Sequence, residues 1–97
     1  MSEQSAEEVA HAHASAVVAG DIGTTVRSMT PDALAKAMQL GNTSWVYFSY
    51  ELERSSQDGE DHLFDVLYTT DIERLKLRYR FRRLDGRWTV VDLDRLD

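Results

Sequence analysis

The side chains best suited to chemistry in this sequence are one histidine and three tyrosines. His13 lies on the apolar stripe of a predicted helix, and Tyr50, Tyr68 and Tyr79 lie on the predicted core side of predicted strands. Buried imidazole and phenol groups need hydrogen-bond partners, so we expect these four side chains to converge on a cavity. One interpretation makes His13 a general base and the tyrosines proton donors to an oxyanion. The alternative, which we favour, makes His13 a core histidine bonded to a hydroxyl or carbonyl, with tyrosines at the rim of the sheet.

Carboxylates are relevant to this choice, because Asp and Glu can also act as the general acid or base. The predicted strand registers direct Asp65, Asp92 and Asp94 away from the core face. The catalytic interpretation is therefore weakened, and His13 stays a candidate without an assigned catalytic role.

The pair His11 and His13 suggests a metal site, but the helical geometry argues against it. Residues two apart on a helix point about 200° apart and cannot share one ion. The chain also has no cysteine, so thiolate ligands are excluded. We expect neither a metal nor another cofactor.

A row of basic residues alternates with apolar ones in the clearest predicted strand; the row is Arg74, Lys76, Arg78, Arg80 and Arg82. It could bind phosphate, with Trp88, Trp45 and Tyr47 adding aromatic surface. It could instead form a cross-strand charge ladder with Asp65, Asp92 and Asp94, and Arg82 could stack on Trp88. We favour the ladder and expect no nucleic-acid partner, because the net charge is −6.

Helical patterns occupy the first part of the chain. Apolar residues at helical spacing predict a helix over 3–19, which ends at Gly20-Asp21. A short second helix is expected over Thr25 to Met29. The start signal Thr30-Pro31-Asp32 predicts a third helix to about Leu40, which offers Leu34, Ala37 and Met38 to the core.

From Ser44 the apolar period changes to two, which predicts four strands. The connections expected are Ser55 to Gly59, Asp71-Ile72 and Asp85-Gly86, and they are too short for parallel crossovers. The fold class is therefore α+β: two or three N-terminal helices on a curved four-stranded antiparallel meander.

Two registers follow from the expected turns. A turn at Asp71-Ile72 pairs Val66 with Leu77 and Asp65 with Arg78. A Gly86 bulge after a type I turn pairs Tyr79 with Val91 and Arg78 with Asp92, so that Arg78 lies between two aspartates.

These registers give the two faces of the sheet. The predicted core face comprises Val46, Phe48, Tyr50, Leu52, Phe64, Val66, Tyr68, Leu75, Leu77, Tyr79, Phe81, Val91 and Leu93. The residues predicted to line a pocket are His13, Tyr50, Tyr68, Tyr79, Phe48 and Phe64. The outer face is expected to be unusually apolar and to form a homodimer interface with Trp45, Tyr47, Leu63, Leu67, Arg78, Arg80, Trp88 and Val90.

Length and composition set the remaining expectations. The 97 residues are enough for one domain, 1–97, and 42% hydrophobic residues are typical of a globular chain. No apolar run reaches the roughly 20 residues of a membrane helix, and the acidic start is unlike a signal peptide. We therefore expect a cytoplasmic protein with no membrane partner. Residues 1–73 hold 13 acids and 3 bases, whereas residues 74–97 hold 8 bases and 4 acids.

The order of elements resembles the nuclear transport factor 2-like superfamily (SnoaL-like, cystatin-like α+β). The residues that carry this resemblance are Ala19-Gly20-Asp21 after the first helix, Thr30-Pro31-Asp32 and the ending Asp85-Gly86-Arg87-Trp88. The resemblance implies a curved sheet folded as a cone around the helices. It covers isomerases, dehydratases and members that only bind or dimerise. Little chain lies between Gly41 and the first strand, so a short member with at most a modest apolar pocket is implied.

Three functions follow as hypotheses. The first is a small non-catalytic domain that forms a dimer or binds a small molecule, such as a small hydrophobic ligand. The second is a small lyase or isomerase acting on a hydrophobic substrate, with His13 as general base. The third is a module that docks another protein through the outer sheet face.

Overall fold

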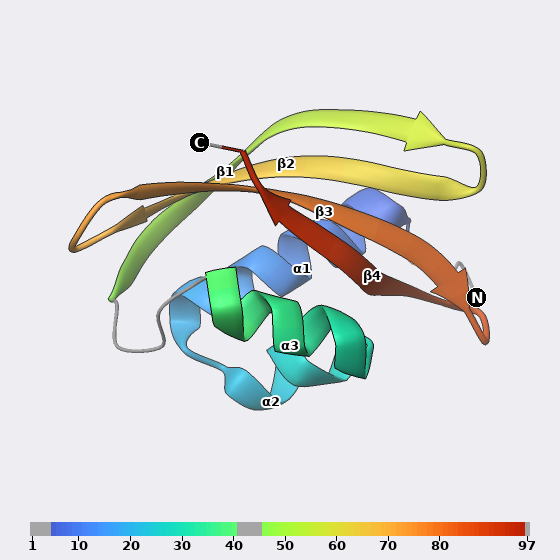
Figure 1. Ribbon diagram of the computed structural model, residues 1–97, viewed down its shortest axis with the longest axis horizontal. Coiled ribbons are helices and arrows are strands. Elements are labelled where there is room, and N and C mark those ends of the chain that lie inside the picture. The colour runs from blue at the N-terminus through green and yellow to red at the C-terminus, as the bar shows by residue number, and fades with distance from the viewer. Residues whose placement is uncertain (1–4, 41–45, 97) are drawn as a thin grey trace.

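The computed structural model describes residues 5–40 and 46–96, in which three helices precede a four-stranded sheet (Figure 1). The helices are α1 (Ala6–Ala19), α2 (Ile22–Arg27) and α3 (Pro31–Leu40), and the strands are β1 (Tyr47–Asp58), β2 (Asp61–Thr70), β3 (Arg74–Leu84) and β4 (Arg87–Arg95). The antiparallel strands lie in the order β1-β2-β3-β4, and the sheet is open. The predicted α+β meander is confirmed. None of the described helices has the length and apolar character needed to cross a membrane.

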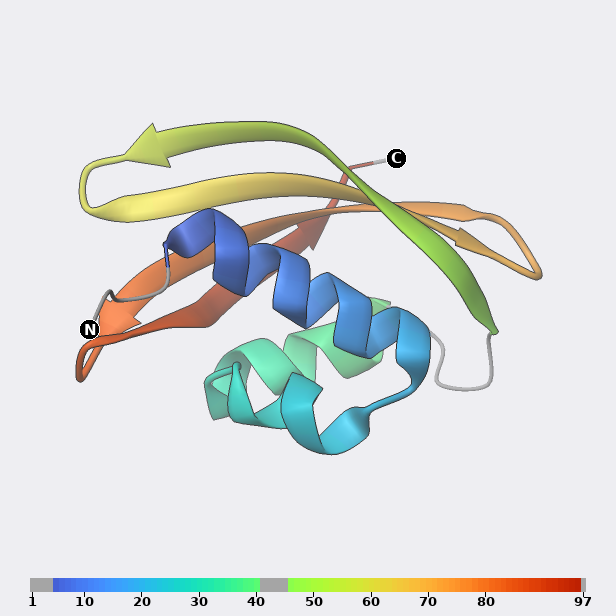
Figure 2. The ribbon, with the colours of Figure 1, turned by 180° about the vertical axis from the view of Figure 1, so that it is seen from behind.

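The helices begin where side chains cap their free amide groups. Ser5 and Glu8 form a capping box at the start of α1, and Gly20 ends α1 with φ 73°. Asp21 accepts a hydrogen bond from the Thr24 amide, so α2 begins at Ile22 rather than at the predicted Thr25. All three helices, α1, α2 and α3, cover the same face of the sheet, as the two opposite views show (Figures 1 and 2).

The core lies between this inner face and the helices. The alternation of β2 and β3 buries the side chains that the sequence predicted: Phe64, Val66, Tyr68, Leu75, Leu77, Tyr79 and Phe81. From the other side, α1 contributes Ala6, Ala10 and Ala14, whose short side chains allow its backbone to approach the sheet. The β2–β3 register also agrees with the prediction, with Val66 opposite Leu77 and Asp65 opposite Arg78.

Strand β1 differs from its predicted alternation. The register shifts between Tyr47 and Ser49, and one extra residue inverts which side chains face the core. Tyr47 therefore packs against the core, whereas Phe48 is 62% exposed and Val46 is 53% exposed. The predicted inward orientation of Val46 and Phe48 was wrong.

The end of β1 also differs from the prediction. A turn was expected over residues 55–59, but Ser55 and Ser56 pair with β2 and the strand continues to Asp58. The connection is the two-residue turn Gly59-Glu60, in which Gly59 has φ 62°. The hairpin is therefore longer than its polar sequence indicates.

The β3–β4 hairpin corrects a second predicted register. Asp85 and Gly86 have φ of 51° and 77°, so they form a tight two-residue turn without the predicted Gly86 bulge. The extra residue lies at Val91, beyond which Tyr79 pairs with Leu93 instead of Val91.

The bulge changes the faces of β4. Val90 was predicted outside but is fully buried opposite Phe81, and Val91 is not in the core. Trp88 also packs against the core from the inner face.

The outer face carries the predicted ladder of charges with different partners on β4. Arg78 donates from Nε and Nη2 to the Asp65 carboxylate at 2.7 and 3.1 Å. Arg80 and Arg82 both donate to Asp61, whereas Arg82 was expected to stack on Trp88.

The β4 aspartates pair mainly with α3. Lys36 of α3 contacts Asp92 and Asp94 at 3.0 and 2.7 Å. Arg78 lies opposite Asp94 rather than the predicted Asp92. The ladder therefore links the sheet edge to a helix as well as strand to strand.

The residues predicted for a dimer interface divide between the two faces. Leu63, Leu67, Arg78 and Arg80 lie on the outer face, opposite to the core residues of β2 and β3. Three others, Tyr47, Trp88 and Val90, face the helices instead. The eighth, Trp45, lies outside the described residues. The described outer face is thus rich in paired charges rather than aromatic.

We expect Asp61→Asn to lower the free energy of unfolding at pH 7 by about 1–2 kcal/mol, because this nearly buried carboxylate forms ion pairs with both Arg80 and Arg82. These arginines hold the pKa of Asp61 at about 2, below the ordinary 3.8. Its stabilisation is complete above pH 3.8 and is lost as the pH falls towards 2. Urea denaturation at pH 7 and in this acid range measures both effects.

The matched control is Asp58→Asn, which removes a carboxylate that is 63% exposed and forms an ion pair with Arg80. Its effect is expected to stay within about 0.5 kcal/mol. Equal losses in the two variants would contradict a special role for Asp61.

Candidate functional site

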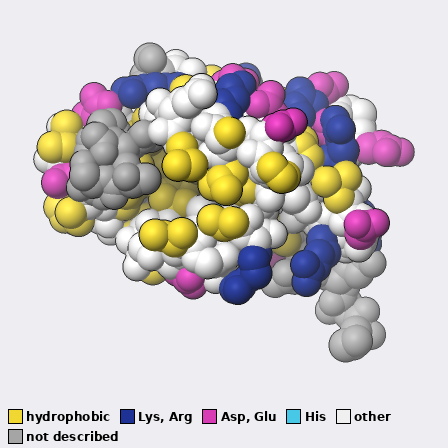
Figure 3. Space-filling view, turned by 60° about the horizontal axis from the view of Figure 1, so that its bottom comes forward, with side chains coloured by type: hydrophobic (Ala, Val, Ile, Leu, Met, Phe, Trp, Pro, Cys, Tyr) yellow, Lys and Arg dark blue, Asp and Glu magenta, His cyan; other side chains and the backbone are white. Residues whose placement is uncertain are grey.

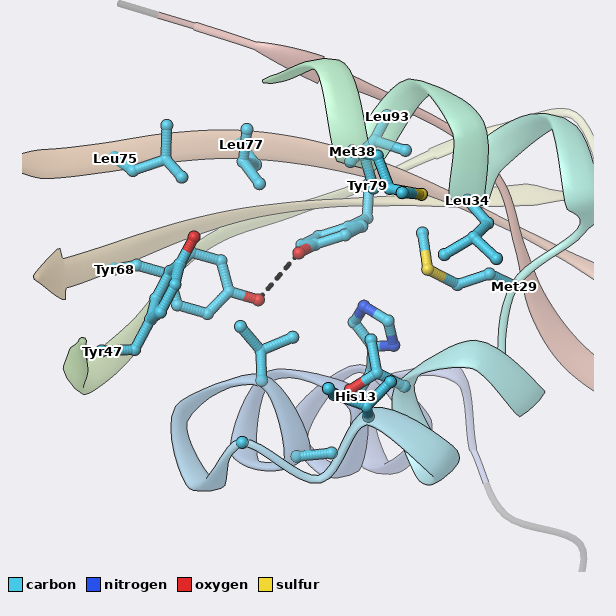
Figure 4. A pocket seen from close by; sticks show the side chains of 16 residues that line it. His13, Met29, Leu34, Met38, Tyr47, Tyr68, Leu75, Leu77, Tyr79 and Leu93 are labelled. Carbon is cyan, nitrogen blue, oxygen red and sulfur yellow. Dashed lines mark hydrogen bonds between the residues drawn. The ribbon is translucent and has the colours of Figure 1, made fainter. Parts of the chain in front are cut away.

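A cavity of about 260 Å³ lies between the helices and the inner face of the sheet. Figure 3 shows hydrophobic side chains gathered around this hollow, and Figure 4 shows the side chains inside it. Its walls are mainly aliphatic and include Val17, Met29, Leu34, Leu75, Leu77 and Leu93. Ile22 and Met38 also line it and are 75% and 65% exposed, which places an apolar rim at its mouth. We call this space the tyrosine cavity, after Tyr47, Tyr68 and Tyr79 in its wall.

Two tyrosine hydroxyls form the main polar feature of the tyrosine cavity. Tyr68 on β2 and Tyr79 on β3 are buried, and their hydroxyl oxygens lie 2.8 Å apart (Figure 4). Burial raises the pKa of both phenols, so both are neutral at physiological pH. The ring of Tyr47 packs edge-on against Tyr68 at 5.5 Å between centroids.

His13 reaches the cavity from α1. Its ring rises towards the sheet beside Tyr79 and Met29 in Figure 4, and its centroid lies 5.0 Å from that of Tyr79. Nδ1 lies 2.7 Å from Ser28 Oγ, whose hydroxyl also lies 3.0 Å from the Thr25 carbonyl oxygen. We assign the Ser28 proton to that carbonyl, so that Nδ1–H donates to Ser28 and Nε2 is an acceptor.

The environment keeps His13 uncharged. The side chain is 2% exposed, and burial lowers its pKa from 6.5 to about 4. At pH 7 the site therefore holds a neutral imidazole and two neutral phenols, with no Lys, Arg, Asp or Glu among the described lining residues.

The structure brings together three of the six residues predicted for the pocket. His13, Tyr68 and Tyr79 line the tyrosine cavity. The other three do not line it. The Tyr50 hydroxyl oxygen lies 3.1 Å from His11 Nδ1. Phe64 is buried in the core, and Phe48 is exposed.

Tyr47 is the lining residue that the sequence reasoning placed on the wrong face. Its inward orientation depends on the Phe48 bulge, and the regular alternation of apolar residues in β1 gave no signal of that bulge. Leu34 and Met38 were expected to face the core from α3, and both line the cavity.

The described residues contain no group of three His, Asp or Glu side chains arranged to hold a metal ion. His11 and His13 have separate partners, Tyr50 and Ser28. The donor and acceptor groups in the cavity instead suit one neutral polar group on an otherwise apolar molecule.

We expect the free energy of unfolding to fall between pH 6.5 and 4, by up to about 3 kcal/mol, because the unfolded chain binds a proton at His13 before the folded chain does. This stabilisation is complete above pH 6.5. His13→Asn, which can still donate to Ser28, should remove most of that slope in urea titrations. His11→Asn is the control and should keep it; a wild-type slope in His13→Asn would contradict the assignment.

Comparison with known proteins identifies no relative for this chain. No family model matches the sequence, and no curated protein or solved structure matches it either. The resemblance to the nuclear transport factor 2-like superfamily therefore depends on the order of elements and on an architecture of three helices and a four-stranded antiparallel sheet.

Proposed function

We propose that this chain is a short nuclear transport factor 2-like domain that binds a small, neutral, largely apolar molecule without transforming it. The observation that carries the proposal is the tyrosine cavity, where apolar walls surround the Tyr68–Tyr79 hydroxyl pair and the His13 ring. The order of helices and strands supports the superfamily assignment.

Size and polarity limit the ligand. A volume of about 260 Å³ is near the lower end of small-molecule sites, which suits one or two fused rings. A charged group would lose its hydration without gaining a counter-ion, since the described lining has no charged residue. A ligand hydroxyl could instead donate to Nε2 of His13, and a ligand carbonyl could accept from the Tyr79 hydroxyl.

The same geometry gives less support to a lyase or isomerase. A histidine with a pKa of about 4 is a weak base at pH 7, and no carboxylate among the lining residues assists it. Such an enzyme would need a substrate with an unusually acidic C–H bond.

Docking through the outer sheet face also has less support than ligand binding. Its described apolar residues Leu63 and Leu67 lie between paired charges such as Arg78–Asp65 and Arg80–Asp61. A homodimer through this face would have to desolvate those pairs. Native mass spectrometry distinguishes a bare dimer from a monomer that retains a ligand.

We expect 2-naphthol to bind the tyrosine cavity and naphthalene-2-sulfonate, its anionic counterpart, to bind there at least about tenfold more weakly. Ala37→Phe should abolish 2-naphthol binding, because residue 37 lines the cavity from α3. Ala35→Phe, at an exposed position on the same helix, is the control. Fluorescence titration measures each affinity. Equal binding of 2-naphthol to Ala37→Phe and Ala35→Phe would contradict the proposal.

We expect Tyr79→Phe to weaken 2-naphthol binding several-fold and to leave naphthalene binding nearly unchanged, because only the first ligand can use the lost hydroxyl. Isothermal titration calorimetry compares the two ligands on each protein. Phe at this position keeps the ring that packs against His13. An equal loss for both ligands would indicate a general packing defect.

A further inference from the structure

A second cavity, of about 410 Å³, lies between α1, α2 and the β3–β4 hairpin. Of the described residues, His13 is the one that lines both this space and the tyrosine cavity. Figure 2 shows the hairpin turn at the end of the sheet near the N-terminal half of α1. We call this space the arginine groove; it is lined by Arg27, Arg87, Trp88, Thr24, Ser28 and Thr89, among others.

The arginine groove differs from the tyrosine cavity in charge. Arg27 from the end of α2 and Arg87 from the start of β4 both line it, and no Asp or Glu occurs among its described lining residues. The lining of this groove is therefore basic, although the chain as a whole has a net charge of −6. Guanidinium groups bind carboxylates through paired, charge-assisted hydrogen bonds, so this arrangement favours an anion.

The side chain of Arg27 is oriented by its neighbours. Its Nη2 donates to Thr24 Oγ1 at 3.2 Å, and that hydroxyl donates to Asp21 at 2.7 Å. Asp21 also accepts from the Thr24 amide, so its carboxylate belongs to the cap of α2. Arg27 is itself exposed at the wall of the groove.

Trp88 supplies a planar apolar surface in the same groove. Its indole is half-buried, and its ring meets the His62 imidazole edge-on at 4.9 Å, with an interplanar angle of 78°. Contacts with the core and with His62 thus hold the indole at a groove that Arg27 and Arg87 also line. An aromatic ring on Trp88 and a carboxylate on the arginines would use both features.

We propose that the arginine groove binds a small aromatic carboxylate, with its ring against Trp88 and its carboxylate bonded to Arg27 and Arg87. This site is separate from the tyrosine cavity, which favours neutral molecules. The proposal therefore does not depend on the function proposed for that cavity.

The test is a ¹H–¹⁵N NMR titration of the whole chain with 2-naphthoate, with neutral 2-naphthamide as the matched probe. We expect 2-naphthoate to shift the Trp88 indole N–H and the amides of residues 86–89. Affinity should fall at least about tenfold for 2-naphthamide and for the double variant Arg27→Gln/Arg87→Gln. Both arginines are exposed, so the fold should tolerate the change.

Arg74→Gln is the control variant, because Arg74 is an exposed arginine at the start of β3, the end of that strand remote from the β3–β4 turn. It should keep wild-type affinity. The proposal is overturned by equal binding of the amide, by an equal loss in Arg74→Gln, or by shifts confined to residues 75–77 of the tyrosine cavity. Absence of binding up to about 10 mM 2-naphthoate also overturns it.

Discussion

Burial of the inner face of β2 and β3 is the constraint on which the rest of this structure depends. Phe64, Tyr68, Leu75 and Phe81 are almost completely removed from water, and each such side chain stabilises the fold by about 1.5–3 kcal/mol. An open sheet of four strands cannot bury one face against itself, so the helices must cover it. The alanines of α1 allow this cover to lie close.

The helices do not fill all of the space against the sheet, and the tyrosine cavity remains between α1, α2, α3 and the inner face. The sheet places the rings of Tyr68 and Tyr79 in the interior, and one of their two hydroxyls donates a hydrogen bond to the other. His13 enters from the opposite side and is satisfied by Ser28. A cavity whose polar groups are few and neutral follows from the same burial that stabilises the fold.

The outer face of the sheet, unlike the inner face, carries many charged side chains. Arginines that alternate with the core residues of β3 are neutralised by aspartates of β2, and Asp61 serves two of them. Arg27 and Arg87 lie outside that ladder, around Trp88 and the β3–β4 turn. Arg78, Arg80 and Arg82 are therefore paired across the sheet, whereas Arg27 and Arg87 line a groove at one end of it.

Local sequence signals predicted much of the fold. Strand β3 alternates regularly from Arg74 to Arg82, and Thr30-Pro31-Asp32 marks the start of α3, so their predictions agree with the structure. The alternation also gave the inward orientation of Tyr68 and Tyr79, and the helical stripe gave that of His13. These features depend on neighbours in sequence, because side-chain direction in a regular element is periodic.

Tertiary structure decided where that periodicity is interrupted. The bulges at Phe48 and Val91 moved Tyr47 and Val90 to the inner face, and neither has a glycine or proline to reveal it. A bulge depends on how two strands fit against each other and the helices, which is a property of residues far apart in the chain. The contact of His13 with Ser28 and the cavity beside it depend on the same packing. Local sequence patterns determined which elements form and most of their inner faces, and the packing of those elements determined which side chains meet.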